Sequence, residues 1–152
     1  KTIKVYPYAK LAAERLETLN ERIESVKSKR KRKQYTRRVQ KFVEDEFSEK
    51  LKKFTITEGQ ILIKLIHRQT GETAFDLIKD LRSGWRAYWY NNTAKLFKMS
   101  LKIPFDPEVS KEDYLIEDIL QRYFQDGILD YQPAHKEFDL YNLSNQWKLK
   151  LK

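Results

Sequence analysis

The 152-residue sequence predicts an all-α fold, a bundle of four to five helices that begins with a long helical hairpin. Apolar residues recur at intervals of three and four in several segments, as they do on the buried stripe of an amphipathic helix. The chain has only 4 Gly and 4 Pro, too few for the tight turns of a β-sandwich or barrel. Three of the apolar segments also follow a capping pattern, Ser or Thr with Asp or Gln three residues later.

The apolar pattern of the first predicted helix runs from Tyr8, and Pro7 lies in the first turn of that helix, where a missing N–H is tolerated. Its apolar stripe consists of Ala12, Leu16, Leu19, Ile23 and Val26, with Glu14, Glu17, Glu21 and Glu24 outside it. The apolar phase changes after Val26, so a short turn between Ser25 and Lys31 is expected, with Ser28 as the N-cap of a second helix. One bent helix is the alternative, because the turn has neither Gly nor Pro.

A short central helix is predicted near residues 58–70. Thr57 and Gln60 form its capping pattern, and Gly71 stands where a helix end often needs a left-handed residue. Apolar residues cover most sides of this segment, which predicts that it is the most buried helix.

Capping patterns at Thr73 and Ser110 open two further helices, near 74–98 and 111–126. A stiff loop, Ile103 to Pro107, separates them. We expect residues 1–127 to form the helical domain, and 128–152 to form a tail that is irregular or packs on its edge.

The helix near 74–98 contains an aromatic cluster. The helical spacing of Trp85 and Tyr88 predicts that both belong to the core. Three other aromatic residues are expected to be partly exposed and to form a protein interface, since Trp and Tyr are enriched at such interfaces. They are Tyr6, Trp89 and Tyr90.

The net charge of +9 is local, because residues 1–54 hold 17 Lys and Arg against 8 Asp and Glu, whereas 55–152 hold 14 of each. Eight basic residues and no acidic one lie in a single run: Lys27, Lys29, Arg30, Lys31, Arg32, Lys33, Arg37 and Arg38. This run is either a solvated face or a binding surface for an anionic protein, lipid headgroups or nucleic acid. Nucleic acid is the least favoured of these, because only Tyr35 is interleaved to stack on bases.

No residue pattern predicts a catalytic, cofactor or metal site. The chain has no Cys, no Gly-x-Ser-x-Gly elbow and no Gly-rich phosphate loop. His67 and His135 are its only histidines, 68 residues apart and without a His-Glu-x-x-His pattern. An acidic group could supply paired carboxylates, which leaves an envelope hydrolase as an alternative. Its members are Asp106, Glu108, Glu112, Asp113, Glu117 and Asp118.

Five blocks of the sequence resemble a family of unknown function found in secreted proteins of the Bacteroidota. They are Lys4–Ala12, Thr55–Ile66, Gly71–Thr73, Asp80–Arg82 and Asp106–Pro107. After Pro107 and in the tail the sequence departs from the family's pattern. The resemblance implies a signal peptide ahead of Lys1 and a location in the periplasm, associated with the outer membrane. It implies no reaction, since none is assigned to the family.

These observations together lead us to expect a non-enzymatic periplasmic accessory or scaffold subunit. Its partner would be a protein of the outer-membrane assembly or export machinery, with contact to anionic lipid headgroups as a further expectation. The longest aliphatic stretch, Ile61 to Ile66, is far shorter than the roughly 18 apolar residues of a membrane span.

Overall fold

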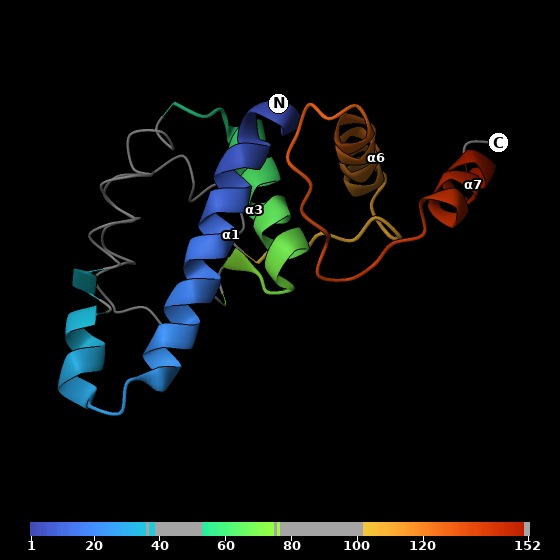
Figure 1. The fold of residues 1–152 in the computed structure, drawn as a ribbon. Coiled ribbons are helices and arrows are strands. Elements are labelled where there is room, and N and C mark those ends of the chain that lie inside the picture. The colour runs from blue at the N-terminus through green and yellow to red at the C-terminus, as the bar shows by residue number, and fades with distance from the viewer. Residues whose placement is uncertain (36, 39–52, 75, 77–101, 151–152) are drawn as a thin grey trace.

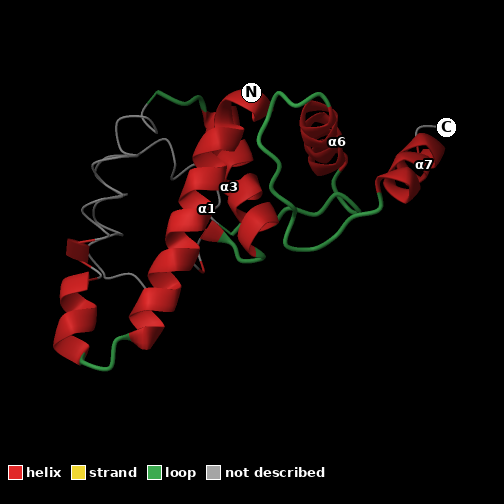
Figure 2. Ribbon diagram, in the orientation of Figure 1, coloured by secondary structure: helices red, strands yellow, loops and turns green. Residues whose placement is uncertain are grey.

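The computed structural model describes residues 1–35, 37–38, 53–74, 76 and 102–150. This part of the chain contains the helices α1 (Thr2–Ser25), α3 (Ile56–Thr70), α6 (Lys111–Gln125) and α7 (Leu140–Lys150), and Figure 2 shows no strand in it. The predicted all-α fold is therefore confirmed. Of the helix expected near 74–98, only Ala74 and Asp76 are described, so the predictions for Trp85 and Tyr88 lie outside the described residues.

Helix α1 begins at Thr2, so Pro7 lies beyond the first turn and the predicted placement of Pro7 in that turn is wrong. A proline inside a helix removes one i→i−4 hydrogen bond, a local cost that favours a later start. Burial of the first two turns offsets that cost. The side chains buried there are Val5, Tyr6 and Ala9. The expected exposure of Glu14 and Glu21 on the other side of α1 is confirmed.

A turn at residues 26–28 separates α1 from a helical segment at 29–35 and 37–38. The Ser28 hydroxyl accepts a hydrogen bond from the Lys31 N–H (3.5 Å), and the Ser28 carbonyl accepts one from the Arg32 N–H (2.9 Å). Ser28 is thus the N-cap, which confirms the turn and excludes the single bent helix. Figure 1 places this turn at the end of α1 that is far from the N-terminus.

The capping pair of helix α3 (Ile56–Thr70) lies two residues before the predicted pair. The Glu58 N–H donates to the Thr55 hydroxyl (3.2 Å), and the Thr55 N–H donates to the Glu58 carboxylate (3.4 Å). This reciprocal pair is a capping box. The prediction of Thr57 and Gln60 as the capping pair is therefore wrong, and Thr57 is exposed within the first turn.

The core lies where α1 and α3 run side by side (Figure 1), with further apolar residues from the loop before α6 and from α6 itself. It consists of Val5, Tyr6, Ala9, Phe54, Ile61, Leu62, Leu65, Ile66, Phe105, Ile116 and Leu120. Ten of the fifteen residues of α3 are buried, which agrees with its predicted central position. Gly71 ends α3 in the left-handed conformation (φ 77°), as predicted.

After α6 the chain runs back toward α1 and α3 before it reaches α7 (Figure 1). We call residues 128–138 the strap. The Tyr6 hydroxyl donates to the carbonyl of Asp130 (2.7 Å), and the N–H of His135 donates to the carbonyl of Arg68 (2.8 Å). The strap thereby joins both central helices through residues that are far apart in the sequence.

Helix α7 is an element that the expected tail lacks. Asp139 caps its first turn, because the Asn142 N–H donates to the Asp139 carboxylate (3.2 Å). Leu143 and Trp147, one turn apart, are buried, and the Trp147 indole donates to the carbonyl of Pro107 (2.9 Å). Packing on the loop before α6 therefore stabilises a helix in a segment with little apolar periodicity.

Candidate functional site

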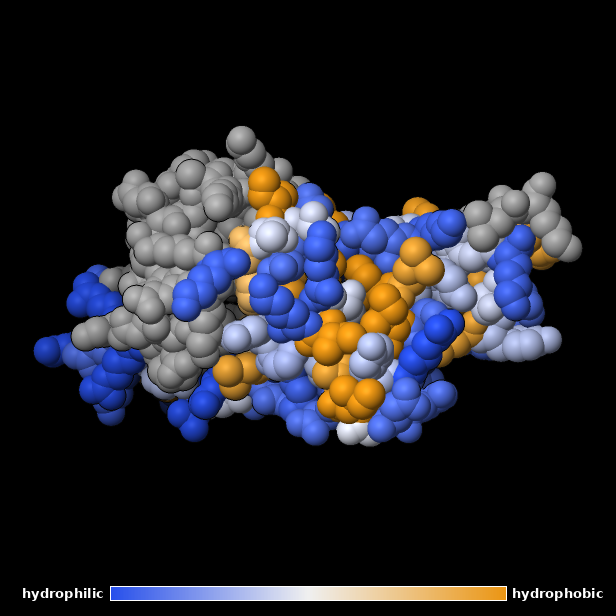
Figure 3. Space-filling model, turned by 90° about the horizontal axis from the view of Figure 1, so that it is seen from above, coloured by the Kyte–Doolittle hydropathy of each residue, from blue (hydrophilic) through white to orange (hydrophobic). Residues whose placement is uncertain are grey.

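The basic run forms the far end of the N-terminal hairpin, which we call the basic tip (residues 27–38). All eight predicted side chains are exposed: Lys27, Lys29, Arg30, Lys31, Arg32, Lys33, Arg37 and Arg38. Seen from above, hydrophilic side chains extend from this end of the molecule, whereas apolar surface gathers near the middle (Figure 3). The fold thus places the predicted anionic-partner residues together at one protruding end.

The basic tip offers charge with little apolar surface. Val26 and Tyr35 are only partly exposed, and the Tyr35 hydroxyl accepts a hydrogen bond from Arg22 (3.5 Å). The guanidinium of Arg32 donates to the carbonyl of Val26, across the turn. The large apolar side chains that are exposed in the described part of the chain all lie elsewhere, from Ile56 onward. A partner of the tip would therefore be held by charge, which depends on salt concentration.

Tyr6 does not belong to an exposed interface, so that prediction is wrong. Its side chain is 1% exposed, packs edge-to-face on Phe124 and donates to the Asp130 carbonyl. Burial raises the pKa of Tyr6 to about 12. The other two predicted interface residues, Trp89 and Tyr90, lie outside the described residues.

A buried ion pair joins α3 to α6. Arg68 donates from Nε to Glu117 Oε2 (2.6 Å) and from Nη2 to Oε1 (3.0 Å), and the two side chains are 0% and 2% exposed. Nη1 of Arg68 also donates to the carbonyl of Gln132 in the strap (3.2 Å). A planar guanidinium satisfied in this way orients three segments at once. With a further bond from Nη1 to Gln69 Oε1 (3.0 Å), four of its five N–H groups are bound within the fold, so we assign the pair a structural role.

The acidic residues of 106–118 are engaged with partners from their own fold. Asp113 pairs with Lys64 (2.7 Å) and also accepts the N–H of Asp106 (2.9 Å). Glu117 pairs with Arg68, and Asp118 pairs with Arg122 (2.9 Å). The described residues hold no group of three or more His, Asp or Glu that could bind a metal. Three of the six candidate carboxylates of the hydrolase alternative are thus held in ion pairs within the fold.

The C-terminal end of α3 brings the two histidines to one pocket of about 330 Å³, which we call the imidazole pocket. Its lining residues are His67, Arg68, Gly71, Pro104, Phe105, Asp106, His135, Lys136 and Phe138. His67 Nδ1 accepts the N–H of Phe105 (2.9 Å), and burial lowers the pKa of His67. Sequence reasoning missed this pocket, because the strap that carries His135 to α3 has no periodic signature.

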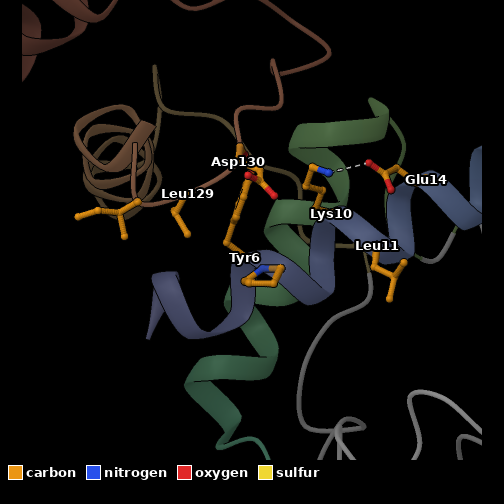
Figure 4. Close-up of a pocket in the computed structure, with 8 residues that line it drawn as sticks. Tyr6, Lys10, Leu11, Glu14, Leu129 and Asp130 are labelled. Carbon is orange, nitrogen blue, oxygen red and sulfur yellow. Dashed lines mark hydrogen bonds and ion pairs between the residues drawn. The ribbon is translucent and has the colours of Figure 1, made fainter. Parts of the chain in front are cut away.

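A second pocket of about 290 Å³ lies between α1 and the start of the strap (Figure 4). Its polar residues are the Lys10–Glu14 ion pair (2.9 Å) and Asp130, and its apolar lining includes Leu11 and Leu129. Because Lys10 and Glu14 neutralise each other, the carboxylate of Asp130 is the remaining charge in this lining.

None of the described helices combines the length and the apolar character that crossing a bilayer requires. No curated protein and no solved structure matches the chain. One family model matches residues 1–122, past Pro107 and through most of α6. The chain therefore belongs to the family described as Domain of unknown function (DUF4294).

Proposed function

We propose that this chain is a non-enzymatic accessory or scaffold subunit that binds an anionic partner protein through its basic tip. The observation that supports the proposal is the exposure of all eight basic side chains of 27–38 at the end of the hairpin. A cluster of one sign of charge raises the rate of encounter with an oppositely charged surface. The tip therefore supplies recognition, and the helical body behind it supplies a rigid support.

An acidic protein suits the tip better than nucleic acid does. Single-stranded nucleic acid is held by bases stacked on aromatic side chains in addition to charge. Tyr35, the aromatic residue within the tip, is half-buried and bonded to Arg22. The contact would then be electrostatic, with anionic lipid headgroups as a further surface for the same charges.

The proposed place of action is the periplasm, at the outer membrane, with a partner in the assembly or export machinery there. This part of the proposal rests on the resemblance of five sequence blocks to secreted proteins of the Bacteroidota. Membership of a family of unknown function agrees with it and adds no activity.

The test is affinity purification of the tagged full-length protein from its own cells after mild cross-linking, followed by mass spectrometry. The variant carries Arg30→Glu, Lys31→Glu and Lys33→Glu and keeps Arg32, whose guanidinium contacts Val26. A matched control reverses three exposed lysines elsewhere, Lys53, Lys111 and Lys148.

We expect the wild type and the control to recover the same outer-membrane proteins in fixed proportion, and the tip variant to lose them. Loss should also follow when salt rises from about 0.15 M to about 0.5 M, because the Debye length shortens. Equal recovery by tip variant and wild type, or recovery of no envelope protein, would contradict the proposal. Recovery with nucleic acid from the cytoplasm would instead support a nucleic-acid-binding module.

A further inference from the structure

The imidazole pocket presents more hydrogen-bond donors than acceptors. His67 Nδ1 accepts the Phe105 N–H, so the ring proton of neutral His67 lies on Nε2, which has no partner among the described residues. His135 and Lys136 add a second imidazole and an ammonium group to the lining. The Lys136 ammonium lies 3.6 Å from a carboxylate oxygen of Glu108, but both side chains are more than half exposed, so this pair is weak and a ligand can compete for the ammonium. Asp106 is the acidic residue there, and its Oδ1 already accepts the Glu108 N–H (3.0 Å). Such a lining favours an anionic group over a cation.

One wall of the pocket is apolar. Phe105 is buried, and its ring meets that of Phe138 edge-to-face with centroids 5.9 Å apart. Pro104 extends this wall. Ligand pockets typically combine an apolar lining with a few placed polar groups, and a volume of about 330 Å³ lies at the small end of their range.

The backbone fixes the position of His135. Its N–H donates to the carbonyl of Arg68, one of the last carbonyls of α3. Its ring lies directly over Gly71, where an added Cβ would come 2.7 Å from Nε2 and 2.8 Å from Cγ. The ring can lie there only because residue 71 has no side chain, so this donor is preorganised.

We propose that the imidazole pocket binds a small ligand that carries one carboxylate on an apolar body. The carboxylate is held by His135, Lys136 and Nε2 of His67, and the body packs on Phe105 and Phe138. This site lies at the C-terminal end of α3 and is independent of the function assigned to the basic tip.

Titration calorimetry and amide NMR of the full chain test the proposal with three probes. Benzoate has both required features, inorganic phosphate has only the charge, and benzyl alcohol has only the apolar ring. The variants are Lys136→Gln, which removes the positive charge, and His135→Ala, which removes the imidazole donor. Lys111→Gln, an exposed lysine outside the pocket, is the matched control. Circular dichroism verifies that each variant keeps its helix content.

We expect benzoate to bind more tightly than either single-feature probe and to shift the amide signals of Phe105, His135 and Phe138. Lys136→Gln should weaken benzoate binding about tenfold, as the loss of a charge-assisted hydrogen bond does, and Lys111→Gln should leave it unchanged. No binding of benzoate by the wild type would overturn the proposal. So would binding that Lys136→Gln and His135→Ala leave unaltered, or phosphate binding as tight as that of benzoate.

Discussion

Gly71 and Gly127 both adopt the left-handed conformation just after a helix, with φ of 77° and 71°. They differ in their surroundings, because an added Cβ meets the His135 ring at Gly71 and nothing within 4 Å at Gly127. Gly127→Ala should therefore cost only the backbone term, about 1 kcal/mol. Gly71→Ala should cost at least about twice as much in urea unfolding. In a His135→Ala background, which lacks the ring, the two glycine substitutions should destabilise the protein by similar amounts. Equal destabilisation in the wild-type background would contradict the contact between residue 71 and the His135 ring.

In the described part of the chain, Glu117 is the carboxylate that pairs with the fully buried guanidinium of Arg68. Breaking a buried pair from one side leaves an uncompensated charge, so Glu117→Gln should lower the free energy of unfolding by about 3 kcal/mol. Combining it with Arg68→Met should cost less than the sum of the single changes. Asp118→Asn, which breaks the exposed pair with Arg122, is the control and should cost less than about 0.5 kcal/mol.

For single residues, the sequence predicted the exposure of charged side chains well. It predicted the exposure of side chains that have partners far away in the sequence poorly. The eight basic residues of 27–38 are exposed because no packing could repay the loss of their hydration. Tyr6 was misjudged because the enrichment of Tyr at interfaces says nothing of partners inside the fold, where the Asp130 carbonyl accepts the Tyr6 hydroxyl. That partner lies 124 residues away, beyond any local pattern.

The start of α3 gives a direct comparison of two threonines. Thr55→Ala removes the hydroxyl that accepts the Glu58 N–H and should destabilise the protein by about 1 kcal/mol. Thr57→Ala changes an exposed residue already inside the helix and should be nearly neutral or slightly stabilising. Thermal unfolding of both variants measures the difference. A larger loss of stability for Thr57→Ala than for Thr55→Ala would favour Thr57 and Gln60 as the capping pair.

The loop before α6 should respond to pH through His67. Burial lowers its pKa below the unfolded value of about 6.5, and Nδ1 can accept the Phe105 N–H only when unprotonated. Well above about pH 6.5 the imidazole of His67 is neutral in both the folded and the unfolded chain, so the full stability is present. As the pH falls below that value, the unfolded chain binds the proton first, so the free energy of unfolding decreases.

The His67→Gln variant retains an acceptor and cannot titrate. Between about pH 7.5 and about pH 5.5 it should lose less stability than the wild type does. Urea unfolding at both pH values, with His135→Gln as the control histidine, measures this difference. Identical losses in wild type and His67→Gln would show that the loop does not depend on the neutral ring.

Helices with strong internal signals were predictable from sequence, and helices that depend on distant packing were not. Ser110 caps α6 as predicted, because its hydroxyl accepts the Asp113 N–H and apolar residues follow at helical spacing. The first turns of α1 and all of α7 escaped prediction. Pro7 argues locally against an early start. Helix α7 is stabilised by the burial of Leu143 and Trp147 and by the hydrogen bond from Trp147 to a loop residue 40 positions away.

On the scale of the whole molecule, the strap creates what the sequence could not reveal. It brings His135 beside His67, although 68 residues separate them, and it completes the bonding of Tyr6 and Arg68. The basic tip, in contrast, is contiguous in sequence and was predictable in full. Surface clusters made from one segment can be found by composition, whereas clusters made by a returning chain require the fold.

The contacts of the strap allow a test of the predicted division of the chain into a helical domain, residues 1–127, and a tail, residues 128–152. A chain that ends at residue 139 lacks α7 but keeps the strap contacts of Asp130, Gln132 and His135. We expect it to unfold cooperatively at a lower temperature, because the buried contacts of Trp147 are lost. A chain that ends at residue 127 also leaves the Arg68 Nη1 and the Tyr6 hydroxyl without these carbonyls, so its transition should broaden or disappear. Thermal circular dichroism distinguishes the two. The same sharp transition in both chains would establish residues 1–127 as an independent folding unit, with the strap an accessory.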